Sequence, residues 1–334
     1  MIGQTIHNYK ILSLLGEGGM GDVYLAVHLK LRHEVAIKIL KFKYASKLNI
    51  RNRFLSEARI LAQLNHPNII KVTDLIDAGD VVAFVMEYIA GISLKELIEK
   101  KGNLRNEEIS EIYLQMLNAV GFIHSKGIIH RDIKPENFMV KSNGNIKLLD
   151  FGIVKKTNVI NMDYTETGIL DIMGTPLYMS PEQMKNTKDV TSSTDIYSMG
   201  LVLWFMVKGR TPYNTTNLSL IDLMKMKNER LPLTHSKWDK VIQISTQNQI
   251  TKRIKSIKLL KELFNETSIK ADNTINKNQK YAVFKEKIFS LFRFRSKHLN
   301  GFLELKKKED RFFYFFIVGI ILFISIWQLL SSIK

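Results

Sequence analysis

A glycine-rich turn near the N-terminus constrains the fold of this chain more than any other feature. Residues 9–15 alternate apolar and polar side chains as a strand does. The turn Gly16–Val23 follows, and a second strand-like run extends to Val27. A strand, a glycine turn and a second strand form a β-hairpin, whereas a dinucleotide-binding fold needs a helix directly after its glycines. The sequence therefore predicts a hairpin and argues against a dinucleotide-binding fold.

The glycines of this turn follow the pattern G-x-G-x-x-G, with Gly16, Gly18 and Gly21 at the fixed positions. Glycine permits positive φ and lets backbone N–H groups close over phosphate groups. Many hairpins carry glycines for the turn alone, so the pattern by itself leaves a structural and a phosphate-binding interpretation open. The hairpin context and the trailing Val23 favour phosphate binding.

A second polar cluster occupies residues 130–137, with the sequence His-Arg-Asp-Ile-Lys-Pro-Glu-Asn. Its polar side chains are too dense for a core strand, and Pro135 excludes a helix interior. Asp132 can orient a hydroxyl, Lys134 can neutralise a transferring phosphate and Asn137 can ligate a metal, which together suit phosphoryl transfer. A solvated loop is the alternative for the cluster taken alone.

Three further residues have compatible chemistry. Lys38 ends the β-branched run 35–38, where it either faces solvent or binds phosphates. Glu57 lies on a helix predicted over residues 51–64, where it is either an exposed acid or a partner for Lys38. Asp150 follows the strand-like run 146–149 and is either a turn residue or, with Asn137, a magnesium ligand, because magnesium prefers hard oxygen ligands.

The chain changes from strand-rich to helix-rich near residues 88–92. A chain of 334 residues exceeds a single typical core, so two lobes are expected. A buried strand is predicted over residues 81–88. Further along the chain, helical patterns cover residues 107–126, 196–207, 218–227 and 255–264.

The C-terminal region contains a long apolar run. No charged residue occurs from Phe312 to Ile333, and about 20 apolar residues in a helix span a bilayer. We expect a transmembrane helix over 312–330, a buried core helix being the alternative. Lys306, Lys307, Lys308 and Arg311 precede this run and only Lys334 follows it, so the positive-inside rule leaves the N-terminal part in the cytoplasm. The expected location is the inner (cytoplasmic) membrane, single-pass, with 331–334 as a short non-cytoplasmic tail.

The formal net charge is +17, and per residue the C-terminal region is the more basic part of the chain. Residues 266–334 hold 13 Lys and Arg against 6 Asp and Glu. Within residues 277–311, apolar side chains share a helical face flanked by basic ones, a pattern that favours binding to anionic lipid. A solvated linker is an equal alternative, and nucleic acid is not expected as a partner. The absence of cysteine excludes disulfides and thiol nucleophiles.

Taken in order, the glycine turn, Lys38, Glu57, residues 130–137, Asp150-Phe151-Gly152 and the segment 174–182 resemble the protein kinase family, and most of all the bacterial eukaryotic-like (Hanks-type) serine/threonine kinases. The resemblance covers about residues 9–265. It implies an α+β, two-lobed kinase fold, with a small β-rich N-lobe over about 1–88 and a large helical C-lobe over about 92–265. It also implies ATP and Mg²⁺, with Mn²⁺ as a second candidate metal, and transfer of the γ-phosphoryl group to protein Ser/Thr hydroxyls.

The resemblance assigns roles to individual positions. The phosphate-covering loop and the adenine pocket would comprise Gly16, Glu17, Gly18, Gly19, Gly21, Val23, Ala36, Glu87, Ile89 and Met139, with Met86 guarding the rear of the pocket. The catalytic group would comprise Asp132, Lys134, Lys38 and Glu57, and the metal ligands would be Asn137 and Asp150. Glu182 and Arg253 match a buried ion pair of the family.

The resemblance also suggests how the chain is regulated. Arg131, next to Asp132, implies control by a phosphate on the loop, and we expect autophosphorylation at Thr165 or Thr167. Thr175 resembles the loop threonine that hydrogen-bonds the catalytic acid and lysine. The organisation expected is a catalytic domain over 1–265, a basic juxtamembrane linker over 266–311 and the anchor, and dimerisation is compatible with it. The alternative function is a membrane-bound pseudokinase scaffold.

Overall fold

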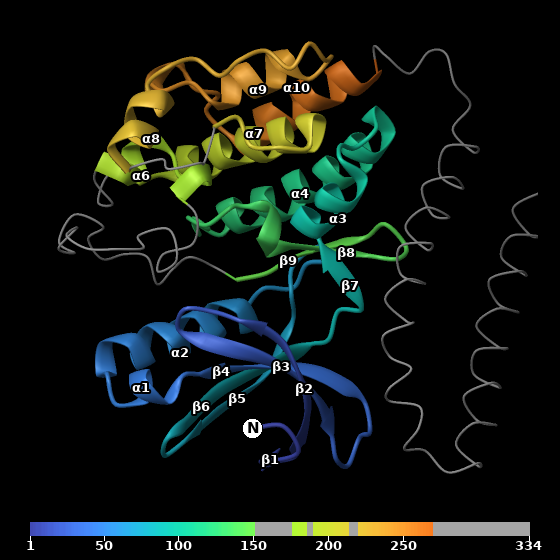
Figure 1. Ribbon diagram of the computed structural model, residues 1–334, viewed down its shortest axis with the longest axis vertical. Coiled ribbons are helices and arrows are strands. Elements are labelled where there is room, and N and C mark those ends of the chain that lie inside the picture. The colour runs from blue at the N-terminus through green and yellow to red at the C-terminus, as the bar shows by residue number, and fades with distance from the viewer. Residues whose placement is uncertain (151–175, 186–189, 214–219, 270–334) are drawn as a thin grey trace, which may run out of the picture. The chain divides into compact units, whose positions relative to one another are not determined.

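The computed structural model describes residues 1–150, 176–185, 190–213 and 220–269, all within the unit Met1–Lys285. Its first part is a six-stranded antiparallel sheet with the strand order β1-β2-β3-β4-β6-β5 and two accompanying helices (Figure 1). The elements of this part are β1 (Thr5–Ile6), β2 (Tyr9–Glu17), β3 (Gly21–His28), β4 (Glu34–Leu40), α1 (Phe42–Ala45), α2 (Leu48–Ala62), β5 (Val72–Ala78) and β6 (Val81–Glu87).

The predicted hairpin is present as β2 and β3, which pair from Tyr9 with His28 to Glu17 with Asp22. One face of the sheet is apolar, and Ile11, Ala26 and Ile37 on it are fully buried. Alternation with period two places these side chains on the same face, so their burial stabilises the sheet through the hydrophobic effect.

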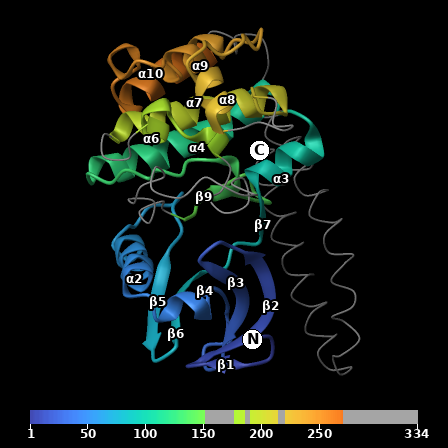
Figure 2. The same ribbon diagram turned by 60° about the vertical axis from the view of Figure 1, so that its left-hand side comes forward.

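Helix α2 lies alongside the sheet, next to β5 (Figure 2). Its buried side chains include Phe54, Ala58 and Leu61, which recur at the spacing of a helix face. The ring of Phe54 lies 5.1 Å from that of Phe84 on β6. The predicted helix 51–64 therefore exists, with its start three residues earlier. The sequence did not reveal β5, since its polar residues obscure the alternation of a strand.

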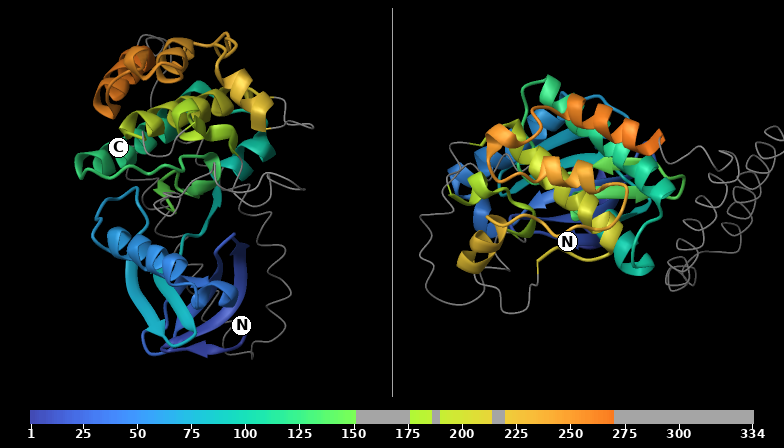
Figure 3. Two further views of the ribbon diagram at one scale, coloured as in Figure 1. Left: turned by 90° about the vertical axis from the view of Figure 1, so that its left-hand side faces the viewer. Right: turned by 90° about the horizontal axis from the view of Figure 1, so that it is seen from above.

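The second part is mainly helical. Its elements are β7 (Gly91–Ser93), α3 (Leu94–Lys101), α4 (Asn106–Ser125), β8 (Phe138–Lys141), β9 (Ile146–Leu148), α6 (Pro181–Lys185), α7 (Ser192–Lys208), α8 (Leu220–Lys227), α9 (Asp239–Ser245) and α10 (Ile257–Ile269), with short 3₁₀ turns at Pro135–Asn137, Pro176–Tyr178 and Ile250–Lys252. Helix α7 is buried on most sides, as its continuous apolarity predicts. It packs against α4 and α9, while α10 covers α4 (Figure 3).

Contacts made by residues 68–69 connect the sheet with the helical part. Ile69 forms a bridge with Leu148 of β9, and the Asn68 amide donates to Gln115 on α4 at 2.9 Å. Asn68 also donates to the Ile146 carbonyl at 3.1 Å. The segment between α2 and β5 is therefore anchored on the second part.

Several predictions fall on residues outside the described ranges. These include the candidate phosphosites Thr165 and Thr167, Thr175, the basic segment 277–311 and the expected membrane helix over 312–330. Among the described residues, no helix has the length and apolarity needed to cross a membrane.

Candidate active site

Lys38 lies at the centre of the sheet on β4, paired with Val23 on β3 and Phe84 on β6. Its Nζ lies 3.1 Å from Oε1 of Glu57 on α2 and 2.7 Å from Oδ1 of Asp150. The side chains of Lys38 and Glu57 are 13% and 5% exposed, whereas that of Asp150 is 45% exposed. The Lys38 ammonium thus connects the sheet with Glu57 on α2 and with Asp150, two residues after β9.

Burial and neighbouring charges shift the pKa values of Lys38 and Glu57 to different extents. Burial alone would lower the pKa of Lys38, but the charges of Asp150 and Glu57 outweigh it and raise that pKa above its usual value. Burial raises the pKa of Glu57 to about 7, because Lys38 only partly offsets it and Asp150 adds a second negative charge. Lys38 therefore stays protonated, and its attraction is divided between two carboxylates.

Asp132 and its neighbours form a second cluster. The 3₁₀ turn begins at Pro135, a position where the missing N–H of proline costs no hydrogen bond. This turn brings Asn137 back toward Asp132, and the Asn137 amide donates to the Asp132 carbonyl at 2.7 Å and to Asp132 Oδ2 at 3.2 Å. Lys134 Nζ lies 3.2 Å from the same Oδ2. Asn137 and Lys134 thus both orient Oδ2 of Asp132.

Asp195 on α7 holds the backbone of this loop. Its carboxylate is fully buried and accepts from the N–H groups of His130 at 2.9 Å and Arg131 at 2.8 Å. His124 lies 2.7 Å from it. These bonds fix Arg131 at φ 66°, a conformation that non-glycine residues rarely adopt. Asp195 was not predicted to have this role from the sequence. Its position directly before the apolar run 196–207 could have indicated a buried acid.

Leu149 connects the two clusters. Its N–H donates to the Asn137 carbonyl at 2.8 Å, and its carbonyl lies 3.0 Å from His130 Nε2. Burial lowers the pKa of His130, against the partial opposition of Asp195 and the Leu149 carbonyl, so a neutral imidazole is favoured there. Asp150, the next residue, has φ 22°. Strained backbone at two adjoining loops is typical of functional sites.

The oxygen donors of Asn137 and Asp150 suit a magnesium ion. Asn137 directs its amide nitrogen at Asp132, which leaves its amide oxygen as a ligand atom. Lys38 uses one oxygen of the half-exposed Asp150 carboxylate, so the other remains for a metal. The described part of the chain holds no group of three His, Cys, Asp or Glu residues that could bind a metal by themselves. Such a two-ligand site fits a metal that is shared with substrate phosphates.

The glycine turn approaches neighbouring backbone too closely for larger residues. A Cβ atom at Gly21 would lie 2.5 Å from the Ile39 carbonyl oxygen, and one at Gly18 would lie 2.7 Å from that of Gly21. A Cβ atom at Gly16 would meet no neighbouring atom within 4 Å. Glu17 ends β2, and Gly19 lies within the turn. Gly18 and Gly21 are therefore required by the packing of the turn itself.

The predicted adenine residues come from three elements. Val23 on β3 and Ala36 on β4 belong to adjacent strands, and Met139 lies on β8 between the fully buried Phe138 and Val140. Ile89 is buried just after β6. Val23 and Ala36 thus lie on neighbouring strands of the six-stranded sheet, whereas Met139 belongs to the three-stranded sheet of the helical part.

The Glu87 side chain turns away from this group. It accepts from Lys147 Nζ at 2.5 Å and from the Lys71 N–H at 3.0 Å. The Glu87 N–H donates to the Lys71 carbonyl at 3.0 Å. These bonds occupy the Glu87 N–H and one oxygen of its carboxylate.

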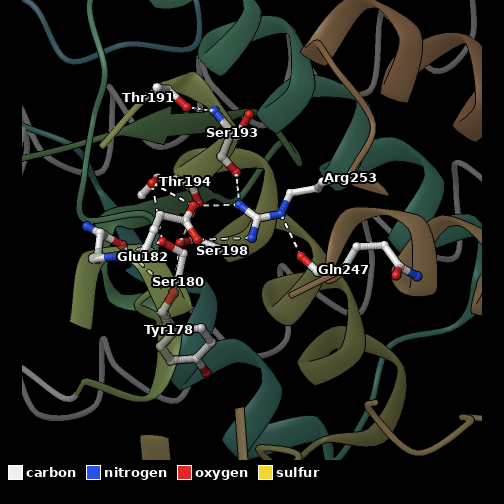
Figure 4. A network of polar contacts seen from close by, with 10 residues as sticks. Tyr178, Ser180, Glu182, Thr191, Ser193, Thr194, Ser198, Gln247 and Arg253 are labelled. Atoms are coloured by element: carbon white, nitrogen blue, oxygen red, sulfur yellow. Dashed lines mark hydrogen bonds and ion pairs between the residues drawn. The ribbon is translucent and has the colours of Figure 1, made fainter. Parts of the chain in front are cut away.

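The segment 176–183 adjoins the Asp132 loop, because Gln183 Nε2 donates to the Arg131 carbonyl at 2.9 Å. The predicted ion pair of Glu182 with Arg253 is confirmed, with Arg253 nitrogens at 2.6 Å and 3.0 Å from the two carboxylate oxygens (Figure 4). Arg253 also donates to the carbonyls of Ser193 and Gln247. Despite burial, these donors lower the pKa of Glu182.

Comparison with known proteins agrees with this geometry. Residues 9–279 match the protein kinase domain family. The chain is 37% identical over 253 residues to the serine/threonine-protein kinase PrkC of Bacillus subtilis, covering 75% of this chain and 38% of PrkC. It is 34% identical over 259 residues to the serine/threonine-protein kinase pkn3 of Myxococcus xanthus, covering 76% of this chain and 47% of pkn3.

The fold also matches a solved structure. The kinase domain of PknI from Mycobacterium tuberculosis superposes with a TM-score of 0.62 at 24% identity, covering 80% of this chain and 98% of that domain. The match therefore supports the arrangement of a β-rich part and a helical part. The chain corresponds to less than half the length of the two curated relatives named above. By its sequence and its fold, the chain belongs to the protein kinase domain family.

Proposed function

We propose that this chain is an ATP-dependent serine/threonine protein kinase. The observation that carries the proposal is the position of Lys38, whose ammonium contacts both Glu57 and Asp150 next to the Asp132–Asn137 loop. This is a preorganised arrangement of charge, of the kind that stabilises a transferring phosphoryl group. Relatives named serine/threonine-protein kinases support Ser and Thr hydroxyls as acceptors.

The roles of individual residues follow from their environment. Asn137 and Lys134 hold the Asp132 carboxylate through Oδ2, and a carboxylate held in this way can accept a hydrogen bond from a substrate hydroxyl and orient it. Lys134 carries a positive charge beside that oxygen and can neutralise charge on the transferred group. Lys38 binds the phosphates of ATP, and Glu57 holds Lys38 in place.

Asn137 and Asp150 would hold a Mg²⁺ ion, which would supply positive charge against the phosphates of ATP. The backbone of the turn at Gly16–Gly21 covers those phosphates, since Gly18 and Gly21 leave no room for side chains there. Val23, Ala36, Met139 and the backbone at Glu87 and Ile89 surround the adenine ring in this proposal.

Transfer of radiolabelled phosphate from ATP to myelin basic protein tests the function. We expect the wild-type chain to label this protein and Asp132→Asn to lose about 10²–10³-fold in rate, as for loss of a group that acts in the transition state. Asp80→Asn, a substitution of an exposed aspartate in the turn between β5 and β6, is the matched control and should leave the rate unchanged. Equal incorporation by wild type and Asp132→Asn would refute the role of Asp132.

The same assay distinguishes a pseudokinase scaffold from an enzyme. A pseudokinase would bind a fluorescent ATP analogue and would show no transfer in any variant. The presence of Lys38, Glu57, Asp132, Asn137 and Asp150 argues for activity, because catalytic losses usually occur at these positions.

We further propose that residues 312–330 anchor the chain in the inner membrane with its catalytic domain in the cytoplasm. The support is the uncharged run from Phe312 to Ile333 and the basic residues that precede it. Residues 277–311 would then lie at the membrane surface. Flotation of the full chain with vesicles, at neutral and anionic lipid compositions, separates anchoring from surface binding. A chain that stays unbound in both compositions would contradict the anchor.

Regulation by autophosphorylation is the last part of the proposal. Arg131 directly precedes Asp132 and could bind a phosphate on Thr165 or Thr167. Peptide mapping after incubation with ATP should find phosphate on one of these threonines. Phosphate confined to other positions would refute this assignment.

A further inference from the structure

Helix α8 ends in a fully buried lysine, Lys227. Lysine is rarely buried, because removing an ammonium from water costs several kcal/mol unless a carboxylate compensates it. Within the part of the chain that the structure describes, no ion pair is recorded for Lys227. Burial lowers its pKa well below the usual value, with only partial opposition from the charge of Glu182. A methionine or leucine would be less costly at this position, so the amine calls for a specific explanation.

The amine of Lys227 makes three contacts. Its Nζ donates to the Leu177 carbonyl at 2.7 Å. It also lies 4.7 Å from the ring centroid of Tyr213 and 5.3 Å from that of Tyr197, whose hydroxyl groups are 3.3 Å apart. The two rings flank the amine, which donates to the carbonyl of Leu177.

The neighbouring carbonyl is held in the same way from a different helix. Ser198 on α7 donates its hydroxyl to the Tyr178 carbonyl at 2.7 Å (Figure 4). Two consecutive peptide groups of the Pro176–Tyr178 turn are thus bound by side chains rather than by a regular backbone ladder. Their orientation depends on Lys227 and Ser198, because each bond fixes the direction of one carbonyl.

This turn lies close to the acceptor end of the site. Five residues after Tyr178, Gln183 donates to the carbonyl of Arg131, the neighbour of Asp132. A protein substrate whose hydroxyl reaches Asp132 therefore comes close to this segment. In the proposed function, ATP is bound by Lys38 and the glycine turn. Neither of these belongs to α8.

We infer that Lys227 is a positioning residue for the protein substrate: from α8 it fixes the Pro176–Tyr178 turn in the conformation on which the substrate chain rests. The inference builds on the proposed kinase function and concerns the acceptor side of the same site. Loss of the Lys227 bond should weaken productive binding of the protein substrate and leave ATP binding unchanged.

The test compares Lys227→Met with Lys225→Met in the full chain. Lys225 lies on the same helix with its side chain 74% exposed, so its substitution controls for the loss of one positive charge from α8. We expect Lys227→Met to raise KM for myelin basic protein about tenfold, in line with the loss of one buried hydrogen bond. KM for ATP should change less than about twofold, and Lys225→Met should match wild type in both constants.

Each outcome decides the inference. A folded Lys227→Met variant with an unchanged KM for the protein substrate would overturn it, even if its thermal stability falls, since that result indicates a structural role only. Should Lys227→Met show no cooperative unfolding, the decision passes to Ser198→Ala, which removes the adjacent hydrogen bond and a single oxygen atom. An unchanged KM for the protein substrate in Ser198→Ala would then overturn the inference. Absence of transfer by wild type itself would instead contradict the kinase function.

Discussion

Among the described residues, Arg253 and Lys38 both bind carboxylates, and they differ in how completely they are satisfied. Arg253 is bound by both oxygens of Glu182 and by two backbone carbonyls, with its side chain fully buried. Lys38 contacts two carboxylates, and one of them, Asp150, is half exposed and lies on a strained backbone. The guanidinium group is planar and presents fixed donors, whereas an ammonium is a compact charge that can exchange partners.

This difference separates a structural ion pair from a functional one. The pKa of Glu182 is lowered because several donors stabilise its charge, so that pair has a single favoured state. The pKa of Glu57 is raised to about 7, because burial is not fully compensated. Charge at the Lys38 cluster can therefore be redistributed when phosphate groups arrive. Substitution of Lys38 should therefore have the larger effect on activity, and substitution of Arg253 the larger effect on stability.

Lys38→Met should produce the largest effect on activity. We expect phosphotransfer to fall by about 10²–10³-fold, because a charge that acts on the phosphates is lost. Stability should change little, because the Glu57 carboxylate, with its pKa near 7, can take up a proton once its partner is gone. Transfer assays and urea titration of the same preparation measure both quantities. A loss of stability as large as that expected for Arg253→Met would contradict the difference between the two clusters.

Arg253→Met should produce the largest effect on stability. Glu182 would be left buried without its partner, and removal of one member of a buried ion pair typically costs about 3–5 kcal/mol. Urea titration followed by far-UV circular dichroism measures this change. Lys252→Met, at the exposed neighbouring position, is the control and should lie within about 0.5 kcal/mol of wild type. A small change for Arg253→Met would mean that Glu182 finds other donors.

The pH dependence of stability should differ in sign between the two acids. The folded-state pKa of Glu57 lies above its ordinary value of 4.5, so the folded protein binds the extra proton and the stabilisation relative to Glu57→Gln declines as pH rises from 4.5 to about 7. The folded-state pKa of Glu182 lies below 4.5, so the stabilisation relative to Glu182→Gln is present above pH 4.5 and declines as pH falls. Urea titrations from pH 8 down to well below pH 4.5 should give slopes of opposite sign in these two pH ranges, and slopes of the same sign would refute the contrast.

Much of the architecture was accessible from the sequence. The hairpin at β2 and β3, the helix carrying Glu57 and the apolar helix α7 follow from periodicity and turn residues, which act locally. The ion pair of Glu182 with Arg253 was predicted from the family resemblance and is present. The boundaries of α2 and α7 differ by about three residues, because their ends depend on tertiary contacts.

The contacts that support the site were harder to predict. Asp195 appeared as one acid at the start of a helix, and its role depends on N–H groups more than sixty residues away. Lys227 is one of two lysines in α8, and its burial follows from two tyrosines elsewhere in the chain. A local pattern cannot contain such information, because long-range packing decides which polar side chain is enclosed.

The first two turns of α7 have a consequence for attempts to alter what this chain acts on. Asp195 holds the Asp132 loop, while Thr194 and Ser198 bind Glu182 and the Tyr178 carbonyl from the same helix. One short stretch thus serves both the phosphate-transferring loop and the adjoining turn. A chimera that imports residues 176–183 from a relative should therefore import residues 194–198 with them. Exchange of residues 176–183 alone would leave them without matching hydrogen-bond partners on α7.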